Sequence, residues 1–390
     1  MSEVDVLIAG AGVGGAALAL ALAAGGDVRV LVCDRRSGPG NINRGDSLLP
    51  AVTRHLAAWG AMPAVRAAGA RPVNRMEVFH ATRGRLFTAP LPATESPYVV
   101  LPHPEIERAL VKTARATGRV RVGYGQRVVA LEREAGRVVG ARVQADGAER
   151  SVRARVVVGA DGAASTVRAE LGLTLPLVQY DHSFYITEVA RPRGYADAMR
   201  VELHPDGGVL VVPIDGQRVG LGVLVHAGEQ DLFRAGSPAE KAAAIGRRSP
   251  LLAGLEVFFK GAHLYRLHRG HAARYVAHGA ALIGDAIHVT NPTAGQGMTM
   301  AIEDAEALAR HLMPALRGSV DIDVALAAYQ NERWPRNAAQ IRWSHWLSRL
   351  YAARGPAMDA LRTAVFRLAD SAPGRRLQGS IWSRLARRGA

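Results

Sequence analysis

Residues 4–15, VDVLIAGAGVGG, decide the fold of this chain. The apolar run from Val4 to Ala9 ends in glycines, which predicts a short buried strand followed by a tight turn. Residues 16–24 are rich in Ala and Leu and predict a helix. A second apolar run, Val28–Cys33, predicts a second buried strand. Strand, turn, helix and strand in this order open a doubly wound parallel sheet.

The glycines of the turn have the spacing of a dinucleotide-binding loop. Gly10, Gly12 and Gly15 form G-x-G-x-x-G. The first permits the tight turn, the second lets the backbone approach a pyrophosphate, and the third lets helix and strand pack closely. The phosphates are expected at the helix N-terminus, where free N–H groups favour anions. Asp34 ends the second strand and can accept hydrogen bonds from ribose hydroxyls, but these features do not separate NAD from FAD.

Two later strands also end in turns that pair an acid with glycine. Residues 156–162, VVVGADG, are followed by Ser165 and Arg168. Residues 280–286 end in Gly-Asp-Ala, and a glycine loop at 292–298 precedes the next predicted helix. In this order, the three stretches resemble the class A flavoprotein monooxygenases, the para-hydroxybenzoate hydroxylase family, over about residues 4–345.

The resemblance implies that one FAD is held along its whole length. It places the Asp285 carboxylate on the ribityl chain and the loop 292–298 beside the isoalloxazine. Reduced flavin carries negative charge that the following helix N-terminus would stabilise. The residues assigned to the cofactor are Gly10, Gly12, Gly14, Gly15, Asp34, Arg35, Arg44, Val128, Asp161, Asp285, Pro292, Gly295, Gly297 and Met298, of which Pro292 and Gly295 line the flavin.

Two basic positions of the family are relevant here. The family commonly has an arginine at the position of Arg44, which reaches the FAD phosphates or the flavin edge. It often has another at the start of the helix that the pattern predicts from Pro104 to Gly118. This chain has His103 there, and its role stays open.

The resemblance also implies the reaction. Reduced FAD forms a C4a-hydroperoxide with O2, and one oxygen atom passes to an electron-rich aromatic ring, with electrons from NADPH, NADH or reduced flavin supplied by a partner. The protein has to exclude water and orient the ring, so no catalytic triad is expected. No His, Cys or acidic pattern predicts a metal site.

The stretch between the second and third turns predicts the substrate layer. Short strands with turns between them, the first at 185–190, predict an antiparallel sheet over 175–270. Residues 76–86 alternate around an Arg-Gly turn and predict a hairpin. The α/β fold is therefore expected as a discontinuous Rossmann-like FAD-binding domain at 1–174 and 271–345, the sheet domain, and a C-terminal helical segment at 346–390. The last twenty residues are basic and poorly patterned, and are expected to be disordered.

The substrate is predicted from the strand around residue 210. Alternation places Val209, Val211 and Pro213 on one face, where hydroxylases of small benzoates use arginine and tyrosine. An apolar wall predicts a bulky, fused-ring aromatic substrate of secondary metabolism. The polar candidates nearby are His182, Tyr185 and Tyr265, which complete the predicted substrate set.

Composition limits the other function classes. The net charge is +15, but the basic residues are scattered without interleaved aromatics, so no nucleic-acid groove is expected. The sole cysteine, Cys33, fits a reducing, cytoplasmic setting. No apolar run is long enough to span a membrane, so at most peripheral membrane contact is expected. The oligomeric state is left as a monomer or a homodimer.

Three alternatives stay open at this point. The basic C-terminus slightly favours a quinone-ring hydroxylase at a membrane surface. His103, in place of the family's arginine, and Thr299, in place of its usual asparagine, leave a non-catalytic flavin-binding scaffold open. A flavin-dependent halogenase is disfavoured, because Trp343 and Trp346 do not match the Trp-x-Trp-x-x-Pro stretch of that class.

Overall fold

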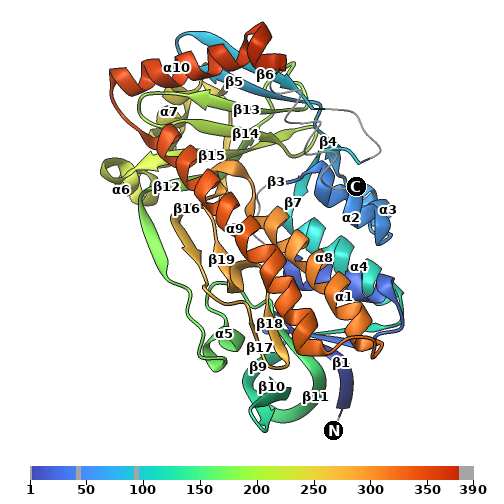
Figure 1. The fold of residues 1–390 in the computed structure, drawn as a ribbon. Coiled ribbons are helices and arrows are strands. Elements are labelled where there is room, and N and C mark those ends of the chain that lie inside the picture. Colours follow the sequence, from blue (N-terminus) through green and yellow to red (C-terminus); the bar gives the residue numbers. More distant parts are fainter. Residues whose placement is uncertain (1, 41–44, 92–95, 377–390) are drawn as a thin grey trace.

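The computed structural model describes residues 2–40, 45–91 and 96–376. Two large sheets face each other across the molecule, with helices around them (Figure 1). The first sheet has the strand order β17-β18-β11-β1-β2-β8, with β10 beside β11 and β9 beside β10. Its strands are β1 (Ser2–Ala9), β2 (Val30–Asp34), β8 (Val120–Tyr124), β9 (Arg127–Glu134), β10 (Arg137–Ala145), β11 (Ala148–Gly159), β17 (Val276–Ala277) and β18 (Ala280–Leu282).

The predicted parallel core of this sheet is confirmed. β1 pairs in parallel with β2 and β11, and β11 pairs in parallel with β18. Helix α1 (Val13–Gly25) connects β1 to β2 and is apolar on all sides, because it packs between the sheet and neighbouring helices. Since β1, β11 and β18 run parallel, their carboxyl ends bring the three glycine-containing turns to one edge.

The second sheet has the order β19-β16-β12-β15-β14-β13-β5-β6. Its strands are β5 (Arg75–His80), β6 (Gly84–Pro90), β12 (Leu177–Ala190), β13 (Ala198–Leu203), β14 (Val209–Pro213), β15 (Arg218–His226), β16 (Val257–His271) and β19 (His288–Val289). The predicted hairpin at 76–86 is present as β5 and β6, but β5 pairs in parallel with β13. The range 175–270 therefore lacks three strands of this sheet, β5, β6 and β19, because strand pairing joins distant parts of the chain.

Two long strands connect the sheets. β12 is longer than the short strand expected at 185–190, and β16, which the sequence did not predict, pairs with it. The end of β16 also pairs with β19, so that His271 lies opposite His288. The second sheet is thereby joined directly to the segment that follows the third turn.

Helices cover the outer faces and one end of the molecule. The remaining helices are α2 (Pro50–Ala58), α3 (Met62–Ala67), α4 (His103–Ala116), α5 (Thr166–Glu170), α6 (Gln230–Ala235), α7 (Pro238–Arg248), α8 (Gly297–Leu316), α9 (Ile322–Ala352) and α10 (Pro356–Asp370). A small sheet of β3 (Gly45–Leu48), β7 (Val99–Pro102) and β4 (Arg71–Pro72) lies beside α2. α9 runs from the first sheet to the second, continuing through the boundary expected at 346 (Figure 1).

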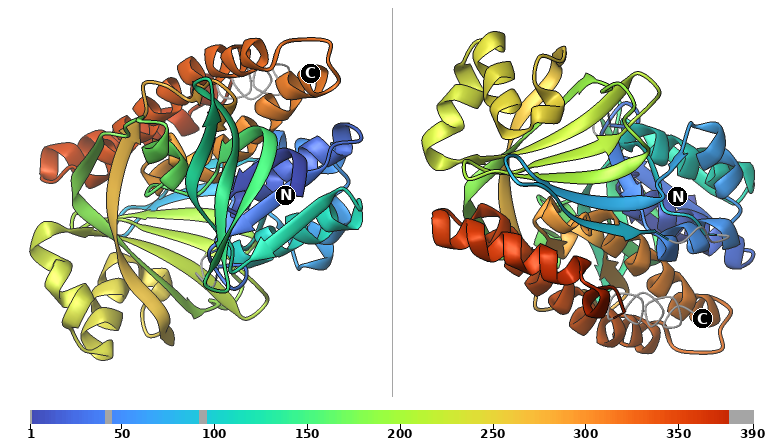
Figure 2. Two further views of the ribbon diagram at one scale, coloured as in Figure 1. Left: turned by 90° about the horizontal axis from the view of Figure 1, so that it is seen from below. Right: turned by 90° about the horizontal axis from the view of Figure 1, so that it is seen from above.

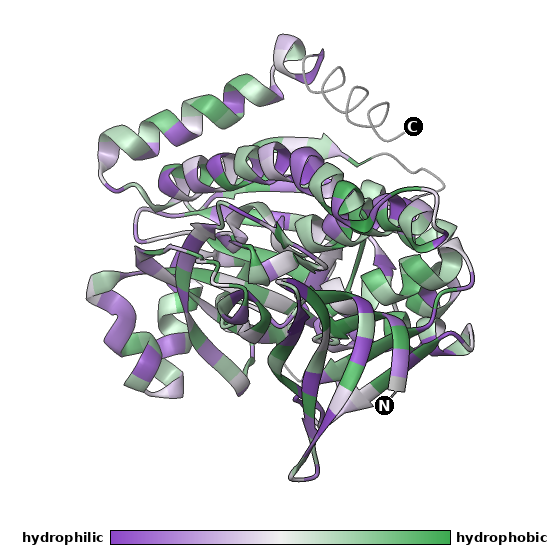
Figure 3. Cartoon of the chain, turned by 60° about the horizontal axis from the view of Figure 1, so that its bottom comes forward, coloured by the Kyte–Doolittle hydropathy of each residue, from purple (hydrophilic) through white to green (hydrophobic). Residues whose placement is uncertain are grey.

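Helix α10 packs against β6 of the β5–β6 hairpin and runs alongside it in the right view of Figure 2. The Asp359 carboxylate of α10 lies 3.0 Å from His80 Nε2 and 2.9 Å from Arg83 Nη2, which fixes the helix to the hairpin. Apolar residues concentrate in the inner strands, whereas the outer helices alternate in hydropathy (Figure 3). The segment 377–390, which includes most of the residues expected to be disordered, lies outside the described residues.

Candidate active site

A cavity of about 810 Å³ lies between the two sheets and is lined by all three turns. Most of the residues assigned to the cofactor line it: Gly10, Gly12, Gly14, Asp34, Arg35, Val128, Asp161, Asp285, Pro292, Gly295, Gly297 and Met298. Arg44 lies outside the described residues. Gly15 is not in the wall but packs helix α1 against the turn.

The first turn requires its glycines for two different reasons. A Cβ on Gly10, whose φ is +104°, would lie 2.3 Å from the Ala160 carbonyl oxygen, and one on Gly15 would lie 1.9 Å from the Gly10 oxygen. A Cβ on Gly12 would meet only the Glu107 carboxylate at 3.8 Å, so this position is open toward the cavity. The first turn of α1 has neither a side-chain cap nor an acidic residue, so its N–H groups can donate to a pyrophosphate.

Asp34 holds this end of the cavity in shape. Its carboxylate accepts hydrogen bonds from the Ala11 N–H at 2.7 Å and the Arg36 N–H at 2.8 Å. Burial alone would raise the pKa of Asp34, but the bonds from Arg36 and Ala11 outweigh it and hold the pKa below its ordinary value. The carboxylate is therefore ionised next to the loop.

His103 is part of a charged network on the same wall. Its Nδ1 atom bonds to the Asp46 carboxylate, and its Nε2 atom lies 3.5 Å from Glu107. Glu107 also accepts bonds from the Gly40 N–H at 2.9 Å and from Arg36 at 3.1 Å. The histidine thus bridges two carboxylates where the family often has an arginine. The sequence offered no local signal for Asp46, Arg36 or Glu107, which are far apart in the chain.

The third turn and the loop after it form the opposite end of the cavity. Asp285 is exposed toward the cavity, whereas Gly284 and Ala286 on either side are buried. The whole loop from Pro292 to Met298 lines the wall and leads into α8, which has no side-chain cap. Its free N–H groups and positive dipole end point to a site for negative charge.

Two buried polar atoms in the wall have no hydrogen-bond partner within the described part of the chain. They are Asp161 Oδ1 and Thr290 Oγ1, from residues that line the cavity. Buried polar atoms in proteins are normally satisfied, so these two indicate that a polar ligand completes the site. Together with the two uncapped helix ends and the open Gly12, they fit an extended dinucleotide such as FAD.

Arg168 joins the second turn to the third. Its guanidinium donates to the Ala286 carbonyl oxygen at 2.9 Å and to the Ala163 oxygen at 2.7 Å. Asp161 accepts from the Thr166 N–H at 2.7 Å, which fixes the second turn at the start of α5. The two turns are therefore held in one geometry by side chains that the sequence had already singled out.

The second sheet forms an apolar half of the cavity, but with the face opposite to the one predicted. Leu210 and Val212 line the cavity, whereas Val209 and Val211 are buried on the other side against Phe233. The predicted face is therefore wrong, and the even-numbered residues of β14 face the cavity. Residues 209–212 are all apolar and both faces of the sheet are covered, so alternation alone could not show which face meets the cavity.

Of the other predicted substrate residues, one lines the cavity and three do not. Tyr265 lines the cavity. Tyr185 belongs to the core on the far face, and its neighbours Phe184 and Ile186 line the cavity instead. His182 is buried with its ring bonded to Ser348 at 2.9 Å and Asp181 at 2.8 Å, and it does not line the cavity. Pro213 is likewise outside the wall.

Tyr98 is a cavity residue that the sequence did not indicate. Its hydroxyl donates to Met199 Sδ at 2.8 Å and is hydrogen-bonded to Ser47. Burial raises the pKa of Tyr98 to about 12, so the hydroxyl keeps its proton. Ser47 also lies beside the glycine loop, because a Cβ added to Gly295 would be 3.5 Å from its Oγ atom. Through Ser47, Tyr98 is therefore linked to the edge of this loop.

Within residues 2–40, 45–91 and 96–376, no three or more His, Cys, Asp or Glu side chains are arranged so that they could hold a metal ion. None of the helices in these ranges is long and apolar enough to cross a bilayer.

Comparison with known proteins agrees with this geometry. The chain matches the FAD binding domain family over residues 3–344. It is similar to the structure of PqsL from Pseudomonas aeruginosa in complex with 2-aminobenzoylacetate, with 30% identity and a TM-score of 0.80, covering 90% of this chain and 97% of PqsL.

Two curated relatives extend the comparison. The 6-methylpretetramide 4-monooxygenase of Streptomyces rimosus is 28% identical over 396 residues, covering 99% of this chain and 92% of the relative. The ubiquinone hydroxylase UbiL of Rhodospirillum rubrum is 33% identical over 217 residues, so that alignment spans only 52% of this chain and 48% of UbiL. The chain therefore belongs to the FAD binding domain family and is a class A, FAD-dependent aromatic monooxygenase.

Proposed function

We propose that this enzyme inserts one oxygen atom into a bulky, apolar, fused-ring aromatic substrate of secondary metabolism. The apolar half of the cavity carries this proposal. Among the described residues, those that β5 and β12–β15 contribute to the wall include no charged side chain. A small aromatic carboxylate would lose its hydration there without gaining a cation, which is costly.

We assign the polar half of the cavity to FAD, which when bound supplies the redox chemistry that activates oxygen. The uncapped start of α1 would hold the pyrophosphate, Asp34 the ribose, and Asp285 the ribityl chain. The N–H groups at Gly297 would stabilise negative charge on the reduced ring. One atom of O2 enters the substrate ring and the other leaves as water, with two electrons supplied by NADH, NADPH or reduced flavin from a partner.

We assign substrate positioning to Tyr98. It is the buried hydroxyl that joins the apolar wall, through Met199, to the flavin loop, through Ser47. Because it stays protonated at neutral pH, its single O–H can turn from Met199 Sδ, a weak acceptor, and donate a hydrogen bond to a phenol or ketone oxygen of the substrate. Trp343, Leu347 and Tyr351 of α9 close the same end of the cavity and help to exclude water.

Of the relatives, the Streptomyces enzyme supports this substrate class, because it is named for 6-methylpretetramide. The ligand in the PqsL structure, 2-aminobenzoylacetate, has instead a single aromatic ring and a carboxylate. A cytoplasmic location, and a monomer or homodimer, complete the proposal. The buried and unpaired Cys33 supports a reducing compartment.

Turnover with the FAD-loaded protein tests the proposal. Polycyclic phenols are compared with 4-hydroxybenzoate, each with NADH, NADPH or chemically reduced flavin, and oxygenated product is measured by mass spectrometry. We expect product from polycyclic phenols only. We also expect Val212→Arg to abolish their turnover while FAD remains bound, with Val178→Arg, at an exposed position outside the cavity, as control. Efficient turnover of 4-hydroxybenzoate would overturn the proposed substrate class.

A second candidate is the hydroxylation of a membrane-bound quinone ring. It is favoured by Trp343, which lines the cavity, is 52% exposed, and stacks on the equally exposed Trp346 with ring centroids 5.3 Å apart. Exposed tryptophans are typical of residues that sit at a membrane–water interface. Sedimentation with anionic lipid vesicles, followed by turnover of a vesicle-embedded quinol, tests this candidate. Binding that is lost in Trp343→Ser/Trp346→Ser, together with quinol turnover, would favour it over the first.

A further inference from the structure

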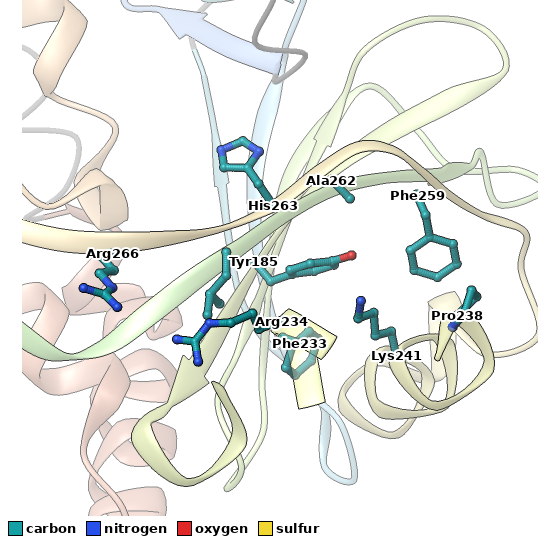
Figure 4. A pocket seen from close by; sticks show the side chains of 10 residues that line it. Tyr185, Phe233, Arg234, Pro238, Lys241, Phe259, Ala262, His263 and Arg266 are labelled. Carbon is teal, nitrogen blue, oxygen red and sulfur yellow. The ribbon is translucent and has the colours of Figure 1, made fainter. Parts of the chain in front are cut away.

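A second cavity, of about 280 Å³, lies on the far side of the second sheet from the flavin cavity (Figure 4). It is enclosed by β12 and β16 and by helices α6 and α7. Side-chain alternation separates the two cavities, because Tyr185 faces this one whereas Phe184 and Ile186 line the other. Neither the sequence motifs nor the proposed reaction uses this second cavity.

The hydroxyl of Tyr185 opens into the cavity. Tyr185 is only 2% exposed, and its hydroxyl makes no hydrogen bond with any described residue. In Figure 4 the hydroxyl points into the cavity, toward the side where Lys241 and Phe259 lie. Burial raises the pKa of Tyr185, so the group is a neutral donor at physiological pH. A hydroxyl that opens into a cavity without a partner among the described residues is available to donate a hydrogen bond to a ligand there.

The charge around the cavity has one sign. Half-buried Lys241 lies with Nζ 5.9 Å from the centre of the Tyr185 ring, and Arg266 is also in the wall. Neither of these cations forms an ion pair with a described residue, and no acidic side chain lines the cavity. Arg234 forms an ion pair with Asp231 at 2.8 Å and therefore adds less positive charge to the cavity. A cationic wall without a counter-ion favours an anionic ligand.

The remaining lining is aromatic. Phe233 packs against Tyr185 with ring centroids 5.0 Å apart, and Phe259 lies across the cavity from them. Pockets for drug-sized ligands occupy roughly 300–1,000 Å³, so a cavity of about 280 Å³ has room for a single ring. Flat aromatic walls select a flat aromatic ligand.

We propose that this cavity binds a single-ring aromatic carboxylate. Its ring packs against Phe233 and Phe259, and its carboxylate accepts hydrogen bonds from the Tyr185 hydroxyl and the Lys241 ammonium. The chemistry is opposite to that of the flavin cavity, whose apolar half has no cation in the described strands. The two sites would therefore select different molecules. They share β12 and β16, so the bound carboxylate touches the back of the strands that form the substrate wall.

Binding of 4-fluorobenzoate to the FAD-loaded protein, followed by fluorine NMR, tests this site. We expect saturable binding without change in the flavin absorbance, and weaker binding of the neutral 4-fluorobenzyl alcohol. We expect Lys241→Gln and Tyr185→Phe each to weaken binding by about tenfold or more. Lys260→Gln, at an exposed lysine of β16 outside both cavities, is the matched control and should bind normally.

Two results would overturn the site. One is unchanged affinity in both Lys241→Gln and Tyr185→Phe, with native circular dichroism. The other is a shift of the flavin absorbance on binding, which would place the carboxylate in the flavin cavity. Because the readout is binding rather than turnover, failure of this proposal leaves the proposed monooxygenase substrate class unaffected, and failure of that class leaves this site unaffected.

Discussion

The Nε2 atom of His288 lies 2.7 Å from the Asp304 carboxylate, and both side chains are fully buried. Asp304 also accepts bonds from Arg333 Nε at 2.8 Å and from the Gly284 N–H at 3.2 Å. Burial alone would raise the pKa of Asp304, but His288 and Arg333 hold it well below its usual range. The buried carboxylate of Asp304 therefore holds the turn that contains Asp285 against both α8 and α9.

Removing the Asp304 charge is expected to destabilise the protein and loosen the third turn. Asp304→Asn leaves buried Arg333 with only the partly exposed Glu303 carboxylate, 3.0 Å away, as counter-charge, and breaking a buried ion pair costs up to about 3–5 kcal/mol. The free energy of unfolding in urea and the FAD content after purification are the measurements. Asp27→Asn, whose carboxylate is almost fully exposed, is the control and should change stability by about 0.5 kcal/mol or less. A stable Asp304→Asn protein with full FAD occupancy would contradict the assigned role.

The glycine loop gives a second prediction, because its members differ in what surrounds them. Gly12→Ala should fold normally, since the added Cβ meets only the Glu107 carboxylate at 3.8 Å, but should bind FAD more weakly because the methyl group occupies the pyrophosphate side. Gly15→Ala should fail to fold, since its Cβ would lie 1.9 Å from a backbone oxygen. Thermal unfolding of the apoprotein measures the loss of stability in each variant, and FAD titration measures the loss of cofactor binding. Equal loss of stability in both variants would count against an open Gly12.

Much of this site was predictable, and the reason is locality. The turn at residues 10–15 and the strand–helix–strand around it depend on neighbouring residues, and so do the two later turns. The β5–β6 hairpin was predicted as a hairpin, but its parallel pairing with β13 joins residues more than a hundred positions apart. His103 likewise acquires its meaning only through Asp46 and Glu107. The sequence predicted the wrong face of the strand at 209–212 for the cavity. Four consecutive apolar residues show no alternation of polar and apolar side chains that would distinguish the two faces.

The stability of the protein should fall between pH 6.5 and pH 4. Burial, with help from the nearby Arg354, lowers the pKa of His226 from 6.5 to about 4, so the folded state binds this proton less readily than the unfolded state. As the pH falls below 6.5, the unfolded chain takes up the proton first and folding loses free energy until the folded pKa is reached. His226→Gln should reduce the proton uptake on unfolding by up to one proton, measured from urea midpoints across this range. An unchanged slope would show that His226 does not contribute.

The corrected face of β14 gives the last prediction, from two adjacent valines. Val212 lines the flavin cavity, so Val212→Phe should narrow the range of polycyclic substrates while stability stays near that of the wild type. Val211 is fully buried on the other face against Phe233, so Val211→Phe should overpack that core and cost about 1–3 kcal/mol of stability. Substrate profiling and urea unfolding of both variants distinguish the faces. If Val211→Phe altered the substrate range and Val212→Phe altered only stability, the originally predicted face would be right. Substitutions at adjacent positions distinguish the two faces because neighbouring side chains of a strand point to opposite sides of its sheet.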